Sequence, residues 1–356
     1  IPRHLSSLVE RGAYAPVSAF TKRPVMPLSQ VAAPEKEVVF RARPQAPAAQ
    51  PVFSRAEALV QTLKRLHGHM LAQTLHADLK AIVRSLANTV LQACDEDADA
   101  LLAALHLDRQ SPYIVVQQLM GCALTEISAR ESGLDAATRM SLACASLTRD
   151  IALLPWQSQL DVQKQGLDEQ QHALIKNHPI RSAEILQENG VDDALWLTFV
   201  RQHHERLDGS GYPFALDKNN ILPGARLLSI ADSYAAMVTP RPNRTNLQPK
   251  EALKALYQLR TSLYDEALLR VSVNTLTPMP PGTIARLANG ETAVVRNRHI
   301  KGMPAYVWTL YDKTGMPVMR PQRRDSNDPN YAITGLLRVE ECRSALLVMK
   351  RLWTHA

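Results

Sequence analysis

A single run of residues, HHERLDGSGYP from His203 to Pro213, limits the possible folds of this chain more than any other feature. Two adjacent histidines close a predicted helix, and the carboxylate of Glu205 follows them directly. The Gly, Ser, Gly, Tyr and Pro that come next cannot continue a helix or a strand, because Pro lacks a backbone donor and Gly favours turns. The run therefore predicts a helix that ends in a loop built around a site.

The two imidazoles are candidate metal ligands. Side chains of adjacent helical residues point about 100° apart, so His203 and His204 can flank one pocket without sharing a face. Neutral imidazoles and carboxylates together suit a divalent metal. A His-His pair alone is more often a surface feature, so other ligands must come from elsewhere. Two candidates are His178, which Pro179 is expected to place in the first turn of a helix, and Asp232, a carboxylate within an apolar run.

These residues resemble a known family. Residues 178–254 are similar to the HD-GYP family, bacterial metal-dependent phosphodiesterases of the HD superfamily that act on cyclic di-GMP. The resemblance extends over residues 110–260 and leaves residues 1–100 without a counterpart. It rests on the order and spacing of His178-Pro179, the run His203–Pro213, Ala225-Arg226 before Ala231-Asp232, and Arg241-Pro242-Asn243-Arg244 before Glu251-Ala252-Leu253.

The chain also departs from the family. An early helix of the family carries a His four residues after a Tyr, where this chain has Tyr113 followed by Gln117. The name-giving His-Asp of the family is here Arg149-Asp150, and the following Lys is Leu153. Gln is a poor ligand for such a metal, and Arg is none because its guanidinium stays protonated. One metal site is therefore expected to be lost.

The resemblance implies a role for each matched residue. In the family, two or three metals bind the scissile phosphate and lower the pKa of a bridging water, which attacks the phosphorus. By resemblance, Asp150 bridges the metals and Asp232 belongs to the first of them. The implied catalytic residues are Asp150, His203 and Asp232, and the implied metal ligands are Asp150, His178, His203, His204 and Asp232. With the first site degenerate, the expected cofactor is at most one divalent metal, such as Fe or Mn, or none.

Five residues are expected to contact the ligand: Arg149, Gly211, Tyr212, Arg241 and Arg244. Arg149 supplies a fixed positive charge in the space of the lost metal, where it can pair with an aspartate or hold a phosphate. Tyr212 can stack on guanine, or it can be a packed loop aromatic. Arg241 and Arg244 can hold phosphate or guanine, although outside the family context they are typical surface charges.

Three functions are compatible with this degenerate site. The leading prediction is cyclic di-GMP signalling, through a degenerate phosphodiesterase domain that binds cyclic di-GMP or a partner with weak or no hydrolysis. One alternative is an active metal-dependent phosphodiesterase with a reduced metal site. Another is a metal-free scaffold whose Gly-Tyr-Pro loop binds a signalling protein. Whether the chain is an enzyme, and whether it forms a homodimer, is left open by the sequence.

The predicted fold is mainly α: an HD-superfamily helical bundle with an N-terminal helical segment and a small C-terminal β domain. The expected divisions are a Pro- and Ala-rich arm or linker over 1–52, the helical segment over 53–108, the HD-GYP-like domain over 109–270 and the β domain with its terminal helix over 271–356. In the β domain, Ala288-Asn289-Gly290 predicts a hairpin, and a strand is expected over 317–320.

Local patterns predict several helix boundaries. Ser54 with Glu57 indicates a capping box. A helix over residues 136–153 is expected to end at Pro155, and separate helices are expected before and after the acidic run that starts at Asp95. The histidines of the N-terminal part are more typical of solvated or hydrogen-bonded side chains than of metal ligands or a proton relay: His67, His69, His76 and His106.

Composition bounds the class of protein. The net charge of +7 and pI near 9.3 favour acidic partners or ligands, and an Arg-rich solvated surface is favoured over nucleic-acid binding. The four cysteines have no CxxC spacing, which indicates buried free thiols. Because no run of about 18 apolar residues and no signal-peptide pattern occurs, a cytoplasmic protein without a membrane span is expected.

Overall fold

The structure is a computed structural model that describes residues 50–354, apart from 76–77, 164, 242–244 and 300–305. The predicted ligand-binding residue Arg244, His76 and nearly all of the predicted arm therefore lie outside the described residues. Contacts within the chain group Gln50–Ala356 into one compact unit.

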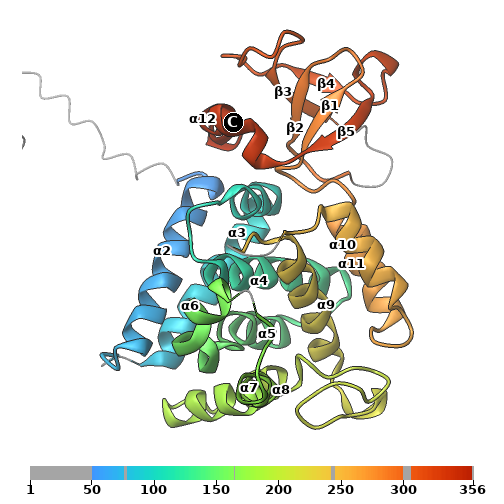
Figure 1. Ribbon diagram of the computed structural model, residues 1–356. Helices are drawn as coiled ribbons and strands as arrows, with labels where there is room; N and C mark the ends of the chain where they lie inside the picture. Colours follow the sequence, from blue (N-terminus) through green and yellow to red (C-terminus); the bar gives the residue numbers. More distant parts are fainter. Residues whose placement is uncertain (1–49, 76–77, 164, 242–244, 300–305, 355–356) are drawn as a thin grey trace, which may run out of the picture. The chain divides into compact units, whose positions relative to one another are not determined.

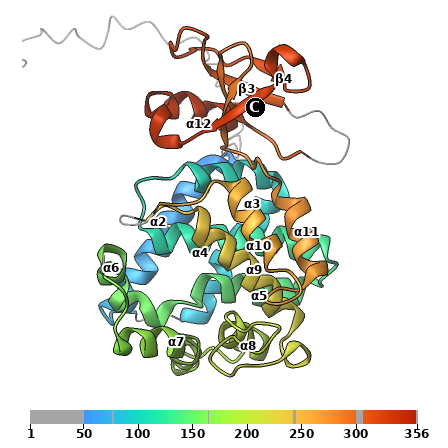
Figure 2. The ribbon, with the colours of Figure 1, turned by 45° about the vertical axis from the view of Figure 1, so that its right-hand side comes forward.

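The fold is mainly helical, as predicted, and Figures 1 and 2 show the helices gathered around α4 and α5. Helix α4 packs against α3, α5, α9 and α11. The helices are α2 (Val52–Leu71), α3 (Leu79–Leu107), α4 (Tyr113–Glu131), α5 (Ala136–Thr148), α6 (Leu154–Val162), α7 (Glu169–Glu188), α8 (Ala194–Gln202), α9 (Pro223–Val238), α10 (Pro249–Gln258) and α11 (Glu266–Leu276).

Helix α4 is the central helix of the bundle. Its buried side chains surround the helix instead of forming one stripe, which is the pattern of a helix enclosed by its neighbours. Its polar residues Gln117, Gln118 and Glu126 are therefore buried as well. Polar groups buried in this way need partners, so α4 is a natural place for a site.

The helix that the sequence predicted to continue through residue 153 ends at Thr148. Helix α5 ends there, a short 3-10 turn follows, and α6 begins at Leu154. Pro155 lies in the first turn of α6, so this Pro begins a helix instead of ending one, because the N–H it lacks is not needed there. Arg149 and Asp150 lie in the break, and both are buried.

The prediction that His178 opens a helix is wrong. Helix α7 runs from Glu169 to Glu188 with Pro179 inside it. A Pro within a helix leaves the carbonyl four residues earlier without its backbone donor, and here that carbonyl belongs to Ile175. The Nδ1 atom of His178 lies 2.6 Å from the Ile175 oxygen and supplies the missing donor. The Pro is tolerated because a side chain replaces its absent N–H.

The two N-terminal helices differ in part from the prediction. Helix α2 begins at Val52 without a side-chain cap, so the predicted capping box of Ser54 and Glu57 is wrong. The helices expected around the acidic run form one element, α3, which is kinked at Asp97. The Asp97 carboxylate accepts a hydrogen bond of 2.9 Å from the backbone of Ala100. The acidic run thus starts a new helical stretch, as its composition indicated.

The described C-terminal residues form an antiparallel sheet in the order β4-β3-β2-β1-β5. Figure 1 labels its strands. Strands β1 and β2 form the predicted hairpin, and Gly290 turns it with a φ of 91°. The strand predicted over 317–320 is wrong, because β4 lies a few residues further on. The elements are β1 (Ile284–Leu287), β2 (Thr292–Val295), β3 (Tyr306–Tyr311), β4 (Arg323–Asp325), β5 (Ile333–Leu337) and the terminal helix α12 (Leu346–Thr354). The predicted boundary at residue 270 falls inside α11.

All four cysteines are free and buried, as predicted. Burial raises the pKa of Cys94 to about 12, which keeps this thiol unreactive. In the described part of the chain, none of the helices has the length and apolar character that crossing a membrane requires.

Candidate metal centre

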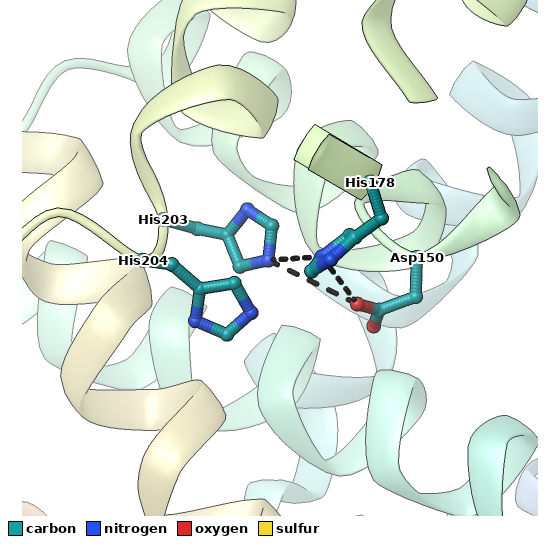
Figure 3. Close-up of side chains that lie close together, drawn as sticks. All are labelled: Asp150, His178, His203 and His204. Carbon is teal, nitrogen blue, oxygen red and sulfur yellow. Dashed lines mark hydrogen bonds and ion pairs between the residues drawn. The ribbon is translucent and has the colours of Figure 1, made fainter. Parts of the chain in front are cut away.

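Three histidines and one aspartate meet in the interior of the helical bundle, as Figure 3 shows. Asp150 follows α5, His178 lies inside α7, and His203 and His204 follow α8. One potential ligand atom of each lies within 4.8 Å of the others. The Nε2 atoms of His178 and His203 are 3.4 Å and 3.8 Å from Asp150 Oδ1. The structure thus gathers four of the five predicted metal ligands.

Backbone carbonyls orient two of the imidazoles. Nδ1 of His178 faces the Ile175 oxygen, and Nδ1 of His203 lies 2.7 Å from the Val200 oxygen. When Nδ1–H donates to a carbonyl, Nε2 carries the lone pair, which is the usual arrangement of metal-ligating histidines. The two Nε2 atoms lie 3.3 Å apart. Two lone pairs facing each other repel, so this donor set fits one cation placed between them.

The charge states of the cluster also suit a metal. Burial opposes ionisation of Asp150, but Arg149 and the neighbouring imidazoles outweigh it and hold the pKa of Asp150 below its usual range. Burial, followed by the charge of His178, lowers the pKa of His203 to about 4. Although His204 keeps some exposed surface, burial and the adjacent imidazoles lower its pKa well below the ordinary value. At neutral pH the cluster therefore offers an ionised carboxylate with His203 and His204 neutral.

Asp232, the fifth predicted ligand, is held by a different set of side chains. Its Oδ1 accepts hydrogen bonds from Arg149 Nε at 3.0 Å and from Gln117 Nε2 at 2.6 Å. Arg149 Nη2 lies 2.8 Å from the same oxygen, and Arg149 Nε lies 3.3 Å from Asp150 Oδ2. Arg149 therefore bridges the two carboxylates that the resemblance assigns to the first metal.

The Arg149 side chain is completely buried and lies against Gly121 of α4. A Cβ on Gly121 would lie 3.4 Å from Arg149 Nη2, at the short limit of ordinary van der Waals contact. Arg149 Nη1 donates to the Ser146 carbonyl. Burial opposes the charge of Arg149, yet Asp232 and Asp150 raise its pKa above the ordinary value. The guanidinium is therefore a permanent cation beside the cluster.

Glu205 fastens the Gly-Tyr-Pro loop to the end of α8. Its carboxylate accepts hydrogen bonds from the backbone N–H groups of Phe214 at 2.8 Å and Leu216 at 2.9 Å. At Gly211 the chain passes so close to Arg206 that a Cβ would lie 2.4 Å from its backbone nitrogen. This packing explains why the loop requires glycine at that position.

The loop places Tyr212 against the histidines. Its ring centroid lies 4.7 Å from that of His204 with the rings tilted by 34°, and 6.3 Å from that of His178. Arg241, another predicted ligand-binding residue, lies with its guanidinium carbon 3.8 Å from the ring centroid of Tyr113. Of the five predicted ligand-binding residues, only Arg244 lies where the structure gives no description.

Sequence reasoning missed three residues of this site. Gly121 lies four residues after Gln117 on one helix face, and this spacing could have linked it to the altered ligand position. Tyr113 lies four residues before Gln117 on the same face. Glu205 follows the two histidines directly, but nothing in the sequence indicates which backbone groups its carboxylate binds.

Fold and site together define a helical protein with a buried His and Asp cluster suited to a divalent metal. Residues 82–268 match the family model described as an HD domain. The chain therefore belongs to the HD domain family, and its motifs and curated relatives support the HD-GYP type within that family.

Named relatives support this assignment. Cyclic di-GMP phosphodiesterase PA4108 of Pseudomonas aeruginosa is 27% identical over 247 residues, covering 69% of this chain and 58% of the relative. Cyclic di-GMP phosphodiesterase PdeB of Borreliella burgdorferi is 24% identical over 183 residues, covering 51% and 48%. The chain thus spans only about half the length of these curated relatives. The solved structure of Bd1817, an HDG"Y"P protein from Bdellovibrio bacteriovorus, shares the fold with a TM-score of 0.51 at 17% identity, over 64% of this chain and 73% of that one.

Proposed function

We propose that this chain is a cyclic di-GMP signalling protein whose degenerate HD-GYP domain binds the dinucleotide and hydrolyses it slowly or not at all. The position of Arg149 carries the proposal, because its guanidinium contacts both Asp150 and Asp232. By resemblance these carboxylates belong to the first metal of the family. The choice of cyclic di-GMP comes from the relatives, which are named for their action on it.

A guanidinium and a metal ion differ in what they do for a phosphodiester. Both are cations that attract phosphate oxygens, and an Arg can do so through two parallel hydrogen bonds. Only the metal lowers the pKa of a water molecule, an effect worth several kcal/mol of transition-state stabilisation. Replacing the metal by Arg149 therefore preserves binding better than catalysis.

The remaining cluster suits one divalent ion. Asp150, His178, His203 and His204 would hold it, and Fe, Mn or a similar ion matches this mixed N and O donor set. A bound ion would supply a Lewis acid for a phosphate oxygen. The chain contributes the orientation of two imidazoles through Ile175 and Val200, and Tyr212 covers one side of the rings.

A second candidate is an active phosphodiesterase with a single metal. The observation that favours it is the intact four-residue cluster, whose donors are buried and oriented. Turnover distinguishes this candidate from the leading proposal, because both expect metal and cyclic di-GMP binding.

The experiment combines elemental analysis of protein purified without added metal with cyclic di-GMP binding and hydrolysis assays in Mn or Fe. The leading proposal expects about one metal per chain, binding of cyclic di-GMP and little or no product. Near-stoichiometric metal with sustained turnover would favour the active enzyme. Absence of metal, binding and turnover would reject both in favour of a scaffold, and attention would move to the Gly-Tyr-Pro loop, where the Phe214 side chain is half exposed. A variant with His203→Ala and His204→Ala is the control for metal bound at this cluster.

A further inference from the structure

Tyr113 and Arg241 form a stacked pair that the metal chemistry does not use. The guanidinium carbon of Arg241 lies 3.8 Å from the centroid of the Tyr113 ring. Tyr113 is 5% exposed, and Arg241 is partly buried. Arg241 Nε is shielded from solvent and has no hydrogen-bond partner in the part of the chain that the structure describes. Buried polar atoms without partners are uncommon and indicate a missing ligand or water.

The pair continues the helix face that already serves the site. Tyr113, Gln117 and Gly121 are spaced four residues apart, so they lie on one face of α4. Gln117 donates to Asp232, and Gly121 lies against the Arg149 guanidinium. Burial raises the pKa of Tyr113 to about 12, with the charge of Arg241 opposing this and that of Asp232 adding to it. Tyr113 is thus a protonated neighbour of the Arg149 and Asp232 pair.

The guanidinium of Arg241 lies over the Tyr113 ring in a cation–π contact, and its Nε has no hydrogen-bond partner among the described residues. A guanidinium held in this way can offer N–H groups to two oxygens of a phosphate. A carboxylate would be the competing partner, but none of the ion pairs among the described residues joins Arg241 to an Asp or Glu. Asp161 of α6 is within the electrostatic influence of Arg241: burial raises the pKa of Asp161, and the charge of Arg241 opposes that rise.

We propose that Tyr113 is a positioning residue that holds Arg241 for a phosphate of the cyclic dinucleotide. Tyr113 contributes the ring face that fixes the guanidinium, and Arg241 contributes the donors. This inference rests on the proposed binding of cyclic di-GMP and adds a residue that precedes the altered ligand position Gln117 by one helical turn.

The test separates the contribution of the Tyr113 ring from those of the charge and the planar geometry of Arg241. The affinity of each variant for cyclic di-GMP is measured by calorimetric titration. Tyr113→Phe keeps the ring, so its affinity should stay within about twofold of the original. Tyr113→Leu removes the ring and should weaken binding by about tenfold. Arg241→Lys keeps the charge but loses the planar fork, and it should weaken binding by a similar factor. Combining Tyr113→Leu with Arg241→Lys should weaken binding less than the product of the two single effects, because both act through one contact.

A matched control lies on α10 and in the turn after it, where the guanidinium carbon of Arg260 sits 4.1 Å from the ring centroid of the exposed Tyr257. Tyr257→Leu removes the same kind of stacking away from the site and should leave affinity unchanged. Metal content should be equal in all variants.

Three results would overturn the inference and leave the proposed function standing. The first two are unchanged affinity for cyclic di-GMP in folded Tyr113→Leu or in Arg241→Lys. The third is an affinity loss in Tyr113→Phe as large as the loss in Tyr113→Leu. If Tyr113→Leu does not fold, the Arg241→Lys and Tyr113→Phe results decide alone. Failure of the original chain to bind cyclic di-GMP would instead reject the proposed function.

Discussion

The Nε2 atoms of His178 and His203 lie 3.3 Å apart, each on a ring whose Nδ1 faces a backbone carbonyl. This relationship is favourable only with a cation between the rings. We therefore expect Mn or Fe to stabilise the folded chain, by about 3 kcal/mol at a hundredfold excess over the dissociation constant. Thermal denaturation with and without chelator measures this effect. A His178→Ala variant should lose most of the metal-dependent shift, and an unchanged shift would place the metal elsewhere.

Pro179 gives a sharper test of how His178 is oriented. Pro179→Ala would restore a backbone N–H that competes with the imidazole for the Ile175 carbonyl. We expect metal affinity to fall by about tenfold, as when the hydrogen-bond partner of a ligating His is removed, although the helix itself loses nothing. Metal titration of the chelator-treated protein measures the affinity. Pro155→Ala, in the first turn of α6, is the control and should leave it unchanged.

Restoring the family ligands should restore a second metal. Gln117→His together with Arg149→His replaces the two residues that hold Asp232 by two imidazoles. We expect metal content to rise by about one ion per chain and hydrolysis of cyclic di-GMP to increase. The single variants are the controls and should stay at the original metal content. A double variant that folds and binds no additional metal would contradict the role given to Arg149.

Removing Arg149 without a replacement should be costly for stability. Arg149→Met leaves Asp232 and Asp150 without their shared cation in a buried setting. Breaking a buried ion pair from one side typically costs about 3–5 kcal/mol of unfolding free energy. Urea denaturation of the metal-free protein measures this. Arg181→Met is a control, because Arg181 pairs with Glu184 and Glu188 on the exposed side of α7 and should change stability by less than about 1 kcal/mol.

The N-terminal histidine His67 should make stability depend on pH. Burial lowers its pKa to about 4, although neighbouring Gln118 and the charge of Asp150 oppose the shift. An unfolded His titrates near 6.5, so between these values the unfolded chain binds the proton more readily and stability falls as pH falls. We expect His67→Gln to reduce the loss between pH 7 and pH 4 by about 3 kcal/mol. Denaturation curves across this range measure it, and the exposed His69→Gln should change nothing.

Much of this site was predictable because its chemistry lies in short motifs. The two adjacent histidines, the Gly-Tyr-Pro loop, Asp150 and His178 keep the spacing of the family, and the structure brings the four ligands together. Their residue types alone were weak evidence, and the order and spacing shared with the family indicated the metal site. The mainly helical fold was likewise expected from the resemblance, which implies an HD-superfamily bundle.

What the sequence missed depends on tertiary contacts. Pro179 was expected to start a helix, but the ring of His178 satisfies the carbonyl that Pro leaves free, so α7 continues. Pro155 was expected to end a helix, but the helix already ends before Arg149. The buried Arg149 side chain forms ion pairs with two aspartates there. Local propensity cannot report such contacts, because their partners lie far away in the sequence.

Arg149 has one property that no bound metal shares: it cannot leave. The occupancy of a metal site varies with the supply of iron or manganese, whereas a buried guanidinium between two aspartates stays in place whatever the cell contains. Under the proposed function, this position carries a cation that is translated with the protein in place of one that must be acquired. The proposed attraction for an anionic ligand at that point is therefore independent of the metal supply.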